Sequence, residues 1–171
     1  DKWGVINQDG ETVINPSYQE MIVIPDKTKD VFICTYDINE EDGTYKTKAL
    51  NGKNEEIFTQ YDQIQVLENI DENDNIWYEK NVLKVMQNGK YGLIDFKGKE
   101  ITKPIYDEID GLPYKEGELL VKQNDKYGVI NIKGSKLINI EYEQITVDGY
   151  YTEQNGYKFA GYIVSNKTQE G

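Results

Sequence analysis

The sequence predicts an all-β protein that consists of about four similar units in tandem. Two observations support this fold class. Ile and Val together number 31 against 8 Leu, 14 residues are Tyr and 2 are Ala, and β-branched and aromatic residues suit a pleated sheet better than a helix. A motif of about twenty residues also recurs along the chain, with Gly between two short apolar segments in each copy, which is typical of β-hairpins.

The motif is clearest in two copies that align without a gap. Residues 90–109 read KYGLIDFKGKEITKPIYDEI, and residues 126–145 read KYGVINIKGSKLINIEYEQI. A third copy, KWGVINQDGETVINPSYQEM, spans 2–21, and a more divergent fourth copy spans 44–64 with one extra residue before its Tyr. Copies that start 36 to 46 residues apart are typical of stacked supersecondary units.

We therefore expect one repeat domain that covers the whole chain. Because the chain opens at Asp1 without Met or a leader sequence, we expect it to be a fragment of a longer protein. The predicted domain is 1–171, with units near 2–43, 44–89, 90–125 and 126–171.

Each unit is predicted to be a three-stranded antiparallel meander. The segments YGLID and YGVIN are apolar on both faces, so we expect both faces to be covered. A turn and a second strand follow, in which Pro16 and Pro104 predict an edge, a bend or a bulge. The third strand is supplied by the matching segments 83–92 and 119–128.

The units are expected to stack as an open or curved array. A closed propeller or barrel-like arrangement is the alternative, and we favour it less because typical propeller blades have four strands and at least four blades are needed for closure. The turn glycines Gly10, Gly52, Gly98 and Gly134 are predicted to adopt positive φ. The structural repeat positions are Trp3, Gly4, Gly10, Tyr18, Gly52, Tyr61, Tyr91, Gly92, Gly98, Tyr106, Tyr127, Gly128, Gly134 and Tyr142.

The segments KWGVINQDG, KYGLIDFKG and KYGVINIKG, each followed by a strand that ends in Tyr, resemble the WG repeats, also called KWG repeats, of bacterial proteins. The second copy departs from the pattern, with Tyr45-Lys46 where the others have an aromatic residue and Gly. The resemblance implies a β-rich module without a general catalytic role, often placed beside other domains. Some proteins with such repeats are secreted or lie at the cell surface, which favours such a location here.

Charge and composition exclude several classes of function. The formal net charge is −12, and all 19 basic residues are Lys. A protein of this charge repels phosphate backbones, and without Arg it lacks the bidentate donor typical of nucleic-acid contacts, so no nucleic-acid partner is expected. No apolar run approaches the roughly 20 residues that span a bilayer.

The residue types also argue against an enzyme. There is no His, so Ser-His-Asp and Cys-His arrangements are excluded and the usual zinc ligands are missing. Carboxylates near Asp107-Glu108 and Glu143 leave open a hydrolase, but we interpret them as solvated strand ends. The one cysteine, Cys34, is interpreted as a small core residue. No cofactor and no metal is expected.

In the acidic segment DENDN, residues 71–75, the spacing of the polar side chains is like that at the start of a calcium-binding loop. The chain has Ile76 where such a loop needs Gly and Val82 where it needs a bidentate Glu. We therefore interpret this segment as an acidic turn.

The aromatic residues outside the repeat are the best candidates for a binding site. They lie in the two long connections, 65–81 and 146–162, and insertions in repeat proteins often carry the binding face. We expect the module to be a structural spacer or a protein–protein interaction domain. The alternative is a carbohydrate-binding or cell-wall-binding module that uses loop aromatics, and a carboxylate-based hydrolase is third. The candidate ligand-binding residues are Trp77, Tyr78, Tyr150, Tyr151 and Tyr157.

Overall fold

The computed structural model describes residues 1–154 and 156–166, and for Tyr150 and Tyr157 it describes the backbone only. Strands make up 55 % of this part of the chain, and it contains no helix, hence no helix that could cross a membrane. The predicted all-β class is confirmed. The strands are β1 (Trp3–Ile6), β2 (Thr12–Tyr18), β3 (Phe32–Tyr36), β4 (Lys46–Leu50), β5 (Glu56–Ile57), β6 (Gln63–Gln65), β7 (Glu68–Ile70), β8 (Ile76–Tyr78), β9 (Leu83–Gln87), β10 (Lys90–Ile94), β11 (Glu100–Tyr106), β12 (Glu108–Gly111), β13 (Glu118–Gln123), β14 (Lys126–Asn131), β15 (Lys136–Tyr142), β16 (Gln144–Thr152) and β17 (Gly156–Ser165).

The strands form five successive sheets, which we number along the chain. Sheet 1 is β1–β2, sheet 2 is β3–β5, sheet 3 has the order β6-β9-β10-β11, sheet 4 has the order β12-β13-β14-β15, and sheet 5 is β16–β17. The remaining hairpin, β7–β8, is inserted between β6 and β9. The described pairings are antiparallel, as predicted.

Sheets 3 and 4 each contain a fourth strand that the sequence did not predict. β6 and β12 begin just after the Tyr of the preceding motif and pair with β9 and β13. In sheet 2, Val23 takes this place through a single bridge to Ile33. The sheets therefore begin after the Tyr that ends each motif, and their borders differ from the predicted unit borders at 89/90 and 125/126.

The hydrophobic core is divided into four clusters, one between each pair of successive sheets. Between sheets 3 and 4, for example, Leu93 packs with Ile109, Val121 and Ile130. Three further clusters lie between sheets 1 and 2, between sheets 2 and 3, and between sheets 4 and 5. Sheets 3 and 4 are thus covered on both faces, which explains why β10 and β14 are apolar on both faces. Cys34 is 0 % exposed in one of these clusters, which confirms its interpretation as a core residue.

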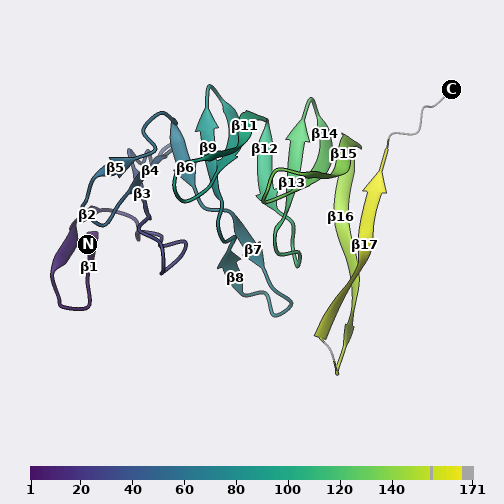
Figure 1. Cartoon of the computed structure of the whole chain (residues 1–171), viewed down its shortest axis with the longest axis horizontal. Helices are drawn as coiled ribbons and strands as arrows, with labels where there is room; N and C mark the ends of the chain where they lie inside the picture. The colour runs from purple at the N-terminus through teal and green to yellow at the C-terminus, as the bar shows by residue number, and fades with distance from the viewer. Residues whose placement is uncertain (155, 167–171) are drawn as a thin grey trace.

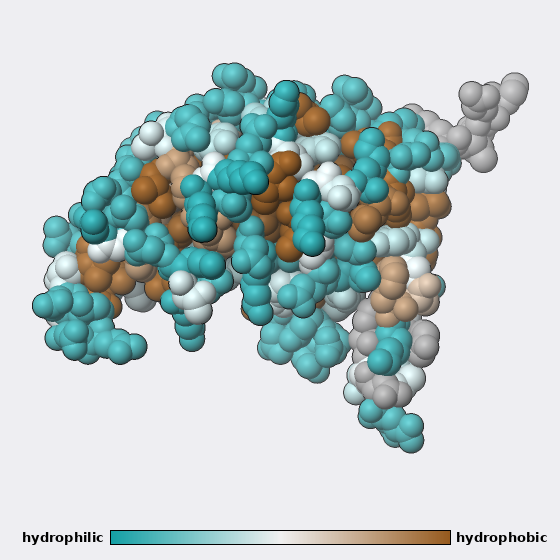
Figure 2. Space-filling view, viewed as in Figure 1, coloured by the Kyte–Doolittle hydropathy of each residue, from teal (hydrophilic) through white to brown (hydrophobic). Residues whose placement is uncertain are grey.

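The sheets follow one another along an open, curved array, with β1 and β17 at opposite ends (Figure 1). Each sheet contacts its neighbours in the row, as in other repeat proteins. On the face shown in Figure 2, hydrophilic side chains cover the projecting turns, and apolar side chains are visible in a band between them and at both ends of the array. The predicted open array is the observed one.

The hairpins share a turn that begins with Asn or Asp. In sheet 3, the Asp95 side-chain oxygen accepts hydrogen bonds from the backbone N–H groups of Lys97 and Lys99, both at 2.9 Å. Asn7, Asn51 and Asn131 make the same pair of bonds in the other copies. The fourth residue of the turn has positive φ, and it is Gly10, Gly98 or Gly134 in three copies, as predicted.

The prediction for Gly52 is wrong. In the second copy the left-handed position is taken by Asn54, with φ 60°, because Asn51 begins the turn and Gly52 directly follows it. Asn tolerates this conformation better than most residues. The copy is therefore shifted by two residues, so that Thr47-Lys48, and not Tyr45-Lys46, occupies the position of the aromatic–Gly pair.

The two prolines lie at bulges, as predicted. Between the pairs Tyr91↔Tyr106 and Leu93↔Thr102, β11 has more residues than β10 and therefore forms a bulge. Pro104 is one of the residues of this bulge. β2 has the same irregularity, and Pro16 lies in it. A bulge accommodates a residue that cannot donate to the ladder.

Gly98→Val is expected to lower the free energy of unfolding by about 2 kcal/mol or more. Gly98 has φ 87°, and a Cβ there would lie 2.7 Å from the Phe58 ring, so strain and a clash add together. Lys97→Ala, at the exposed neighbour, should change it by less than about 0.5 kcal/mol. Urea unfolding measures both, and equal effects would contradict this role of the turn glycine.

Candidate functional site

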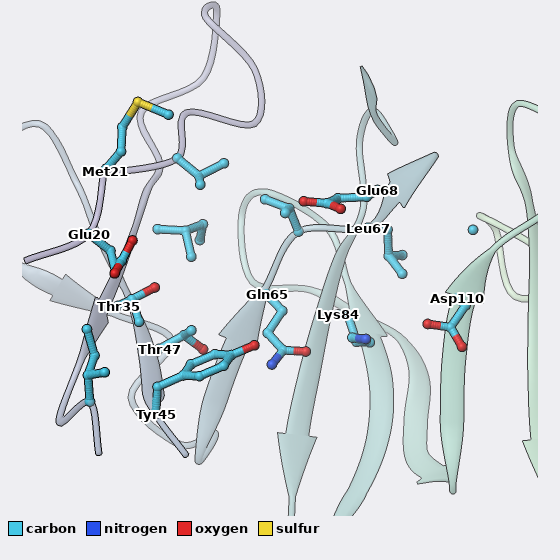
Figure 3. A pocket seen from close by; sticks show the side chains of 15 residues that line it. Glu20, Met21, Thr35, Tyr45, Thr47, Gln65, Leu67, Glu68, Lys84 and Asp110 are labelled. Carbon is cyan, nitrogen blue, oxygen red and sulfur yellow. The ribbon is translucent and has the colours of Figure 1, made fainter. Parts of the chain in front are cut away.

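A groove of about 780 Å³ crosses sheets 2, 3 and 4 (Figure 3). It follows the segments that begin these sheets, and hairpin β7–β8 adds Glu68 to its wall. Residues Glu20 and Met21 lie at one end, and Asp110 lies at the other. Since these residues come from three sheets, the groove exists only in the stacked array. Its apolar lining residues are Met21, Val23, Ile33, Ile38, Val66 and Leu67.

The charged residues of the groove are mostly acidic. Three carboxylates, Glu20, Glu68 and Asp110, line it together with one ammonium group, Lys84. The Lys84 Nζ donates to the Ile109 carbonyl oxygen at 3.1 Å. Burial lowers the pKa of Lys84, and the nearby carboxylates partly oppose this shift. Lys84 thus joins sheets 3 and 4, and the carboxylates give the groove an excess of negative charge.

The groove also contains an unpaired hydroxyl. Thr47 is 6 % exposed, and its Oγ1 has no hydrogen-bond partner in the part of the chain that the structure describes. A buried hydroxyl without a partner is unfavourable. Gln65 and Tyr45, which is 50 % exposed, line the groove near it. These polar groups provide hydrogen-bonding positions among the apolar ones.

The predicted aromatic residues lie on two different hairpins. Trp77 and Tyr78 are half-buried in β8, and Tyr151 is 68 % exposed in β16. The side chains of Tyr150 and Tyr157 lie outside the described residues. The structure thus brings Trp77 and Tyr78 together on one strand and places Tyr151 on another hairpin.

The two connections expected to be irregular are in fact hairpins, which corrects that expectation. In β7–β8, Asp71 begins the same kind of turn as the repeats, since its side-chain oxygen accepts from the N–H groups of Asn73 and Asn75. These bonds lower the pKa of Asp71, and Asp74 takes the left-handed position with φ 59°. The acidic segment is therefore a turn, as interpreted. Among the described residues, no group of three or more Cys, Asp and Glu side chains is placed to hold a metal ion.

The loop that joins β12 to β13 contacts both hairpins. Asn69 of β7 donates to the carbonyl oxygens of Leu112 and Lys115, at 3.0 and 3.2 Å. On the other side, the Lys115 Nζ lies 4.1 Å from the centre of the Phe159 ring in β17. The Tyr162 hydroxyl donates to Glu118 at 2.8 Å. The hairpins therefore lie on the same side of the array, one on each side of this loop (Figure 1).

The carboxylates considered for hydrolysis have structural contacts. Asp107 forms an ion pair with Lys90, and Glu143 forms one with Lys126. Asp107 also accepts a hydrogen bond from the Asn124 N–H at 3.0 Å. The Lys90 contact and this N–H lower the pKa of Asp107. Each pair ties the Lys that opens a motif to the acid that follows the Tyr of the same copy.

The aromatic repeat positions of the three close copies form cross-strand pairs. Trp3 lies opposite Tyr18, Tyr91 opposite Tyr106, and Tyr127 opposite Tyr142. Lysines of neighbouring strands lie over two of these rings, with Lys84 over Tyr91 at 5.0 Å and Lys122 over Tyr127 at 5.4 Å. Such contacts stabilise the sheet.

Cys34 has no features of a reactive thiol. Burial raises the pKa of this thiol to about 11. A reactive cysteine needs a lowered pKa and access to solvent. The position is structural.

Sequence reasoning missed the residues that line the groove. The stacking of sheets brings together residues that share no motif in the sequence. These residues are Glu20, Thr47, Gln65, Lys84 and Asp110. The only signal in the sequence is the repeat itself, which predicts that the starts of the sheets lie side by side.

The family described as WG containing repeat matches the sequence at residues 3–24 and 91–127. A comparison with curated proteins gave no match, and neither did a comparison with solved structures. The matched segments include the hairpins of sheets 1 and 3, in which an aromatic residue precedes Gly opposite a bulge. The chain therefore carries the WG containing repeat at residues 3–24 and 91–127.

Proposed function

We propose that this chain is a non-catalytic repeat module that binds a protein partner in the groove across sheets 2, 3 and 4. The observation that carries the proposal is the combination of apolar walls with three carboxylates, Glu20, Glu68 and Asp110. An extended segment with alternating apolar and basic residues matches this lining. The rest of the array holds the three sheets in register and acts as a spacer.

Electrostatics support a cationic partner. The chain has a formal net charge of −12, which attracts cations at long range and repels anions. The ammonium of Lys84 is engaged with the Ile109 carbonyl oxygen and lies near the Tyr91 ring. The carboxylates at the two ends of the groove remain as the main recognition groups for lysine or arginine side chains.

The absence of catalysis is part of the proposal. The carboxylates of Asp107 and Glu143 form ion pairs with lysines. A glycosidase requires two carboxyl groups that are free to face a substrate. Incubating the protein with chromogenic glycosides and peptides tests this point. Turnover that is lost in Asp107→Asn would contradict it.

The groove proposal predicts that charge removal weakens binding. The probe is a fluorescein-labelled peptide of alternating Lys and Leu, with a Glu and Leu peptide as the reference. We expect the double variant Glu20→Gln, Asp110→Asn to bind the Lys peptide about fivefold more weakly, because each lost ion pair is worth about 0.5 kcal/mol or more. Fluorescence anisotropy at two salt concentrations measures the change.

The matched control is the pair of substitutions Asp9→Asn and Glu55→Gln, which also removes two charges, at exposed turn positions that do not line the groove. It should leave the affinity for the Lys peptide nearly unchanged. If the double variant and the control bind equally, or if the Glu peptide binds as well as the Lys peptide, the groove is not the binding site.

A second candidate function is carbohydrate binding by the hairpin aromatics. It is supported by the 68 % exposure of Tyr151 and the partial exposure of Trp77, since exposed aromatic rings can stack on sugars. A glycan array with the intact protein tests it, followed by tryptophan quenching in the Trp3→Phe variant, where Trp77 is the one remaining Trp. Quenching that Tyr151→Ala leaves unchanged, or binding on the glycan array that Trp77→Ala leaves unchanged, would contradict this candidate.

A further inference from the structure

One position of the repeat differs in sheet 2. The residue four places before the Asn or Asp that begins the turn is aromatic in sheets 1, 3 and 4. These residues are Trp3, Tyr91 and Tyr127. In sheet 2 the turn begins at Asn51, and the residue at this position is Thr47. A short side chain therefore replaces the aromatic ring of the other copies.

In sheets 3 and 4 this ring packs against the core between its own sheet and the next one. Tyr91 contacts the cluster between sheets 3 and 4, and Tyr127 contacts the cluster between sheets 4 and 5. Thr47 faces sheet 3 in the same way, because it lies two residues before Ala49 on β4. Ala49 belongs to the cluster between sheets 2 and 3. The space of a ring is thus left open beside Thr47, and it forms part of the groove.

The walls of this space are apolar. Lys84 pairs with Leu93 in sheet 3. In sheet 2, Ile33 pairs with Ala49, the residue that corresponds to Leu93, so an alkyl side chain takes the place of the lysine. The other apolar residues that line the groove around it include Val23, Val66 and Leu67. An uncharged ring can be buried among these side chains without the desolvation of a charge.

An exposed ring lies next to this space. Tyr45 precedes Thr47 by two residues and lines the groove with it (Figure 3). Tyr45 is 50 % exposed. A second aromatic ring in the groove can contact it edge to face or in an offset stack, the arrangements that aromatic pairs favour.

The charges around the space suit a basic segment. Glu20 lies at one end of the groove and Asp110 at the other, and Glu68 lies in its wall (Figure 3). A segment that places one aromatic side chain beside Thr47 can direct basic side chains on either side of it to these carboxylates.

We propose that the partner inserts one aromatic side chain, flanked by Lys or Arg, into the space beside Thr47. The inserted ring takes the place that Tyr91 has between sheets 3 and 4. This inference rests on the proposed function, since it assigns an anchor residue to the basic segment that binds the groove. An aromatic anchor in an apolar pocket with charged groups around it is a common arrangement at protein–protein interfaces.

Three fluorescein-labelled peptides test the inference with the unmodified chain. They share the alternating Lys and Leu sequence and differ at one central position, which is Phe, Leu or Ala. We expect the Phe peptide to bind about threefold more tightly than the Leu peptide, because its ring contacts Tyr45 in addition to the apolar walls. It should bind at least about tenfold more tightly than the Ala peptide. Equal affinities of the Phe and Leu peptides in fluorescence anisotropy would contradict the inference.

Thr47→Tyr restores, within the chain, the ring that the other copies have at this position. It should reduce the affinity for the Phe peptide to that for the Leu peptide, with a thermal midpoint of unfolding at or above that of the unmodified chain. Thr47→Val is the matched control, since it keeps the size of the side chain and removes a hydroxyl that is unpaired among the described residues. The preference for Phe should persist in this control. If Thr47→Tyr keeps the preference, or if it unfolds because the ring finds no space, the inference is wrong.

The double variant Glu20→Gln, Asp110→Asn separates this inference from the proposed function. It should weaken the binding of all three peptides by similar factors, because the carboxylates contact the Lys side chains and not the central residue. If it weakens none of them, the groove does not bind basic segments and the proposed function is wrong. If it weakens all three while the Phe peptide has no advantage, the groove still binds a basic segment and only the aromatic anchor is wrong.

Discussion

Gly92→Ala is expected to destabilise the protein by about 3 kcal/mol or more, although it adds a single methyl group. A Cβ at Gly92 would lie 2.8 Å from both the Pro104 nitrogen and the Thr102 carbonyl oxygen. These atoms belong to the backbone of the paired strand β11, so they cannot move without a break in the ladder. Gly92 lacks the positive φ of the turn glycines, and the reason for Gly here is the close approach of two chains at the bulge.

The same crowding recurs in the other close copies. A Cβ at Gly128 would lie 2.7 Å from the Ile138 carbonyl oxygen, and one at Gly4 would lie 2.5 Å from the Ile14 carbonyl oxygen. The Gly after the aromatic residue is therefore required by packing of the backbone, in every copy that contains the bulge. Gly128→Ala should have an effect similar to that of Gly92→Ala.

The control for this prediction is Gly89→Ala. Gly89 has φ 76°, and nothing lies within 4 Å of the added Cβ, so only the strain of the left-handed conformation remains, about 1 kcal/mol. Urea unfolding followed by tryptophan fluorescence compares the two variants. If Gly92→Ala costs no more than Gly89→Ala, crowding at the bulge does not select Gly at this position.

The hairpins of the fold were predictable because their signals are local. Each turn needs an Asn or Asp acceptor and a residue with positive φ three positions later, and both requirements are visible in the sequence. The second copy misled the prediction because Asn51-Gly52 resembles a two-residue turn, whereas Asn51 begins the longer turn and Asn54 takes the left-handed position. A search for Asn or Asp followed three residues later by Gly, Asn or Asp would have found this turn and the one at Asp71.

The fourth strand of each sheet was not predictable in the same way. β6 spans three residues, Gln63–Gln65, which is too short to show an alternating pattern. Its partner β9 lies beyond the β7–β8 hairpin, and the pairing depends on contacts distant in sequence. The groove has the same origin, because residues such as Glu20 and Asp110 meet only after three sheets have stacked.

The aromatic site was predicted from a correct observation about where the repeat is interrupted. Trp77 and Tyr151 do lie in segments that leave the repeated strands, but these segments form hairpins with contacts of their own. The buried polar contacts that hold the first hairpin could not be predicted, because Glu79 belongs to no repeated motif.

Glu79→Ala is expected to lower the free energy of unfolding by about 3 kcal/mol, because it removes the acceptor for two buried donors. Glu79 is 1 % exposed. Its Oε1 accepts from the Asn69 side chain at 3.1 Å, and its carboxylate accepts from the Gly117 N–H at 3.1 to 3.2 Å. These bonds join the end of β8 to the loop between β12 and β13. Thermal unfolding measures the loss, and hydrogen exchange at Gly117 should rise.

Glu79→Gln separates the charge from the hydrogen bonds, because the amide oxygen can still accept from both donors. Burial raises the pKa of Glu79 in the folded protein above its ordinary value of 4.5. Between these two pKa values the folded state holds a proton that the unfolded state has lost, so the contribution of Glu79 to stability falls as the pH rises through this interval. Gln carries no such proton, and Glu79→Gln should therefore gain stability relative to the unmodified protein as the pH rises above the ordinary carboxyl pKa of 4.5. Glu72→Gln, at an exposed position of the β7–β8 turn, should show no comparable trend. A stability difference between Glu79→Gln and the unmodified protein that is independent of pH would show that the buried carboxyl group does not titrate differently in the folded state.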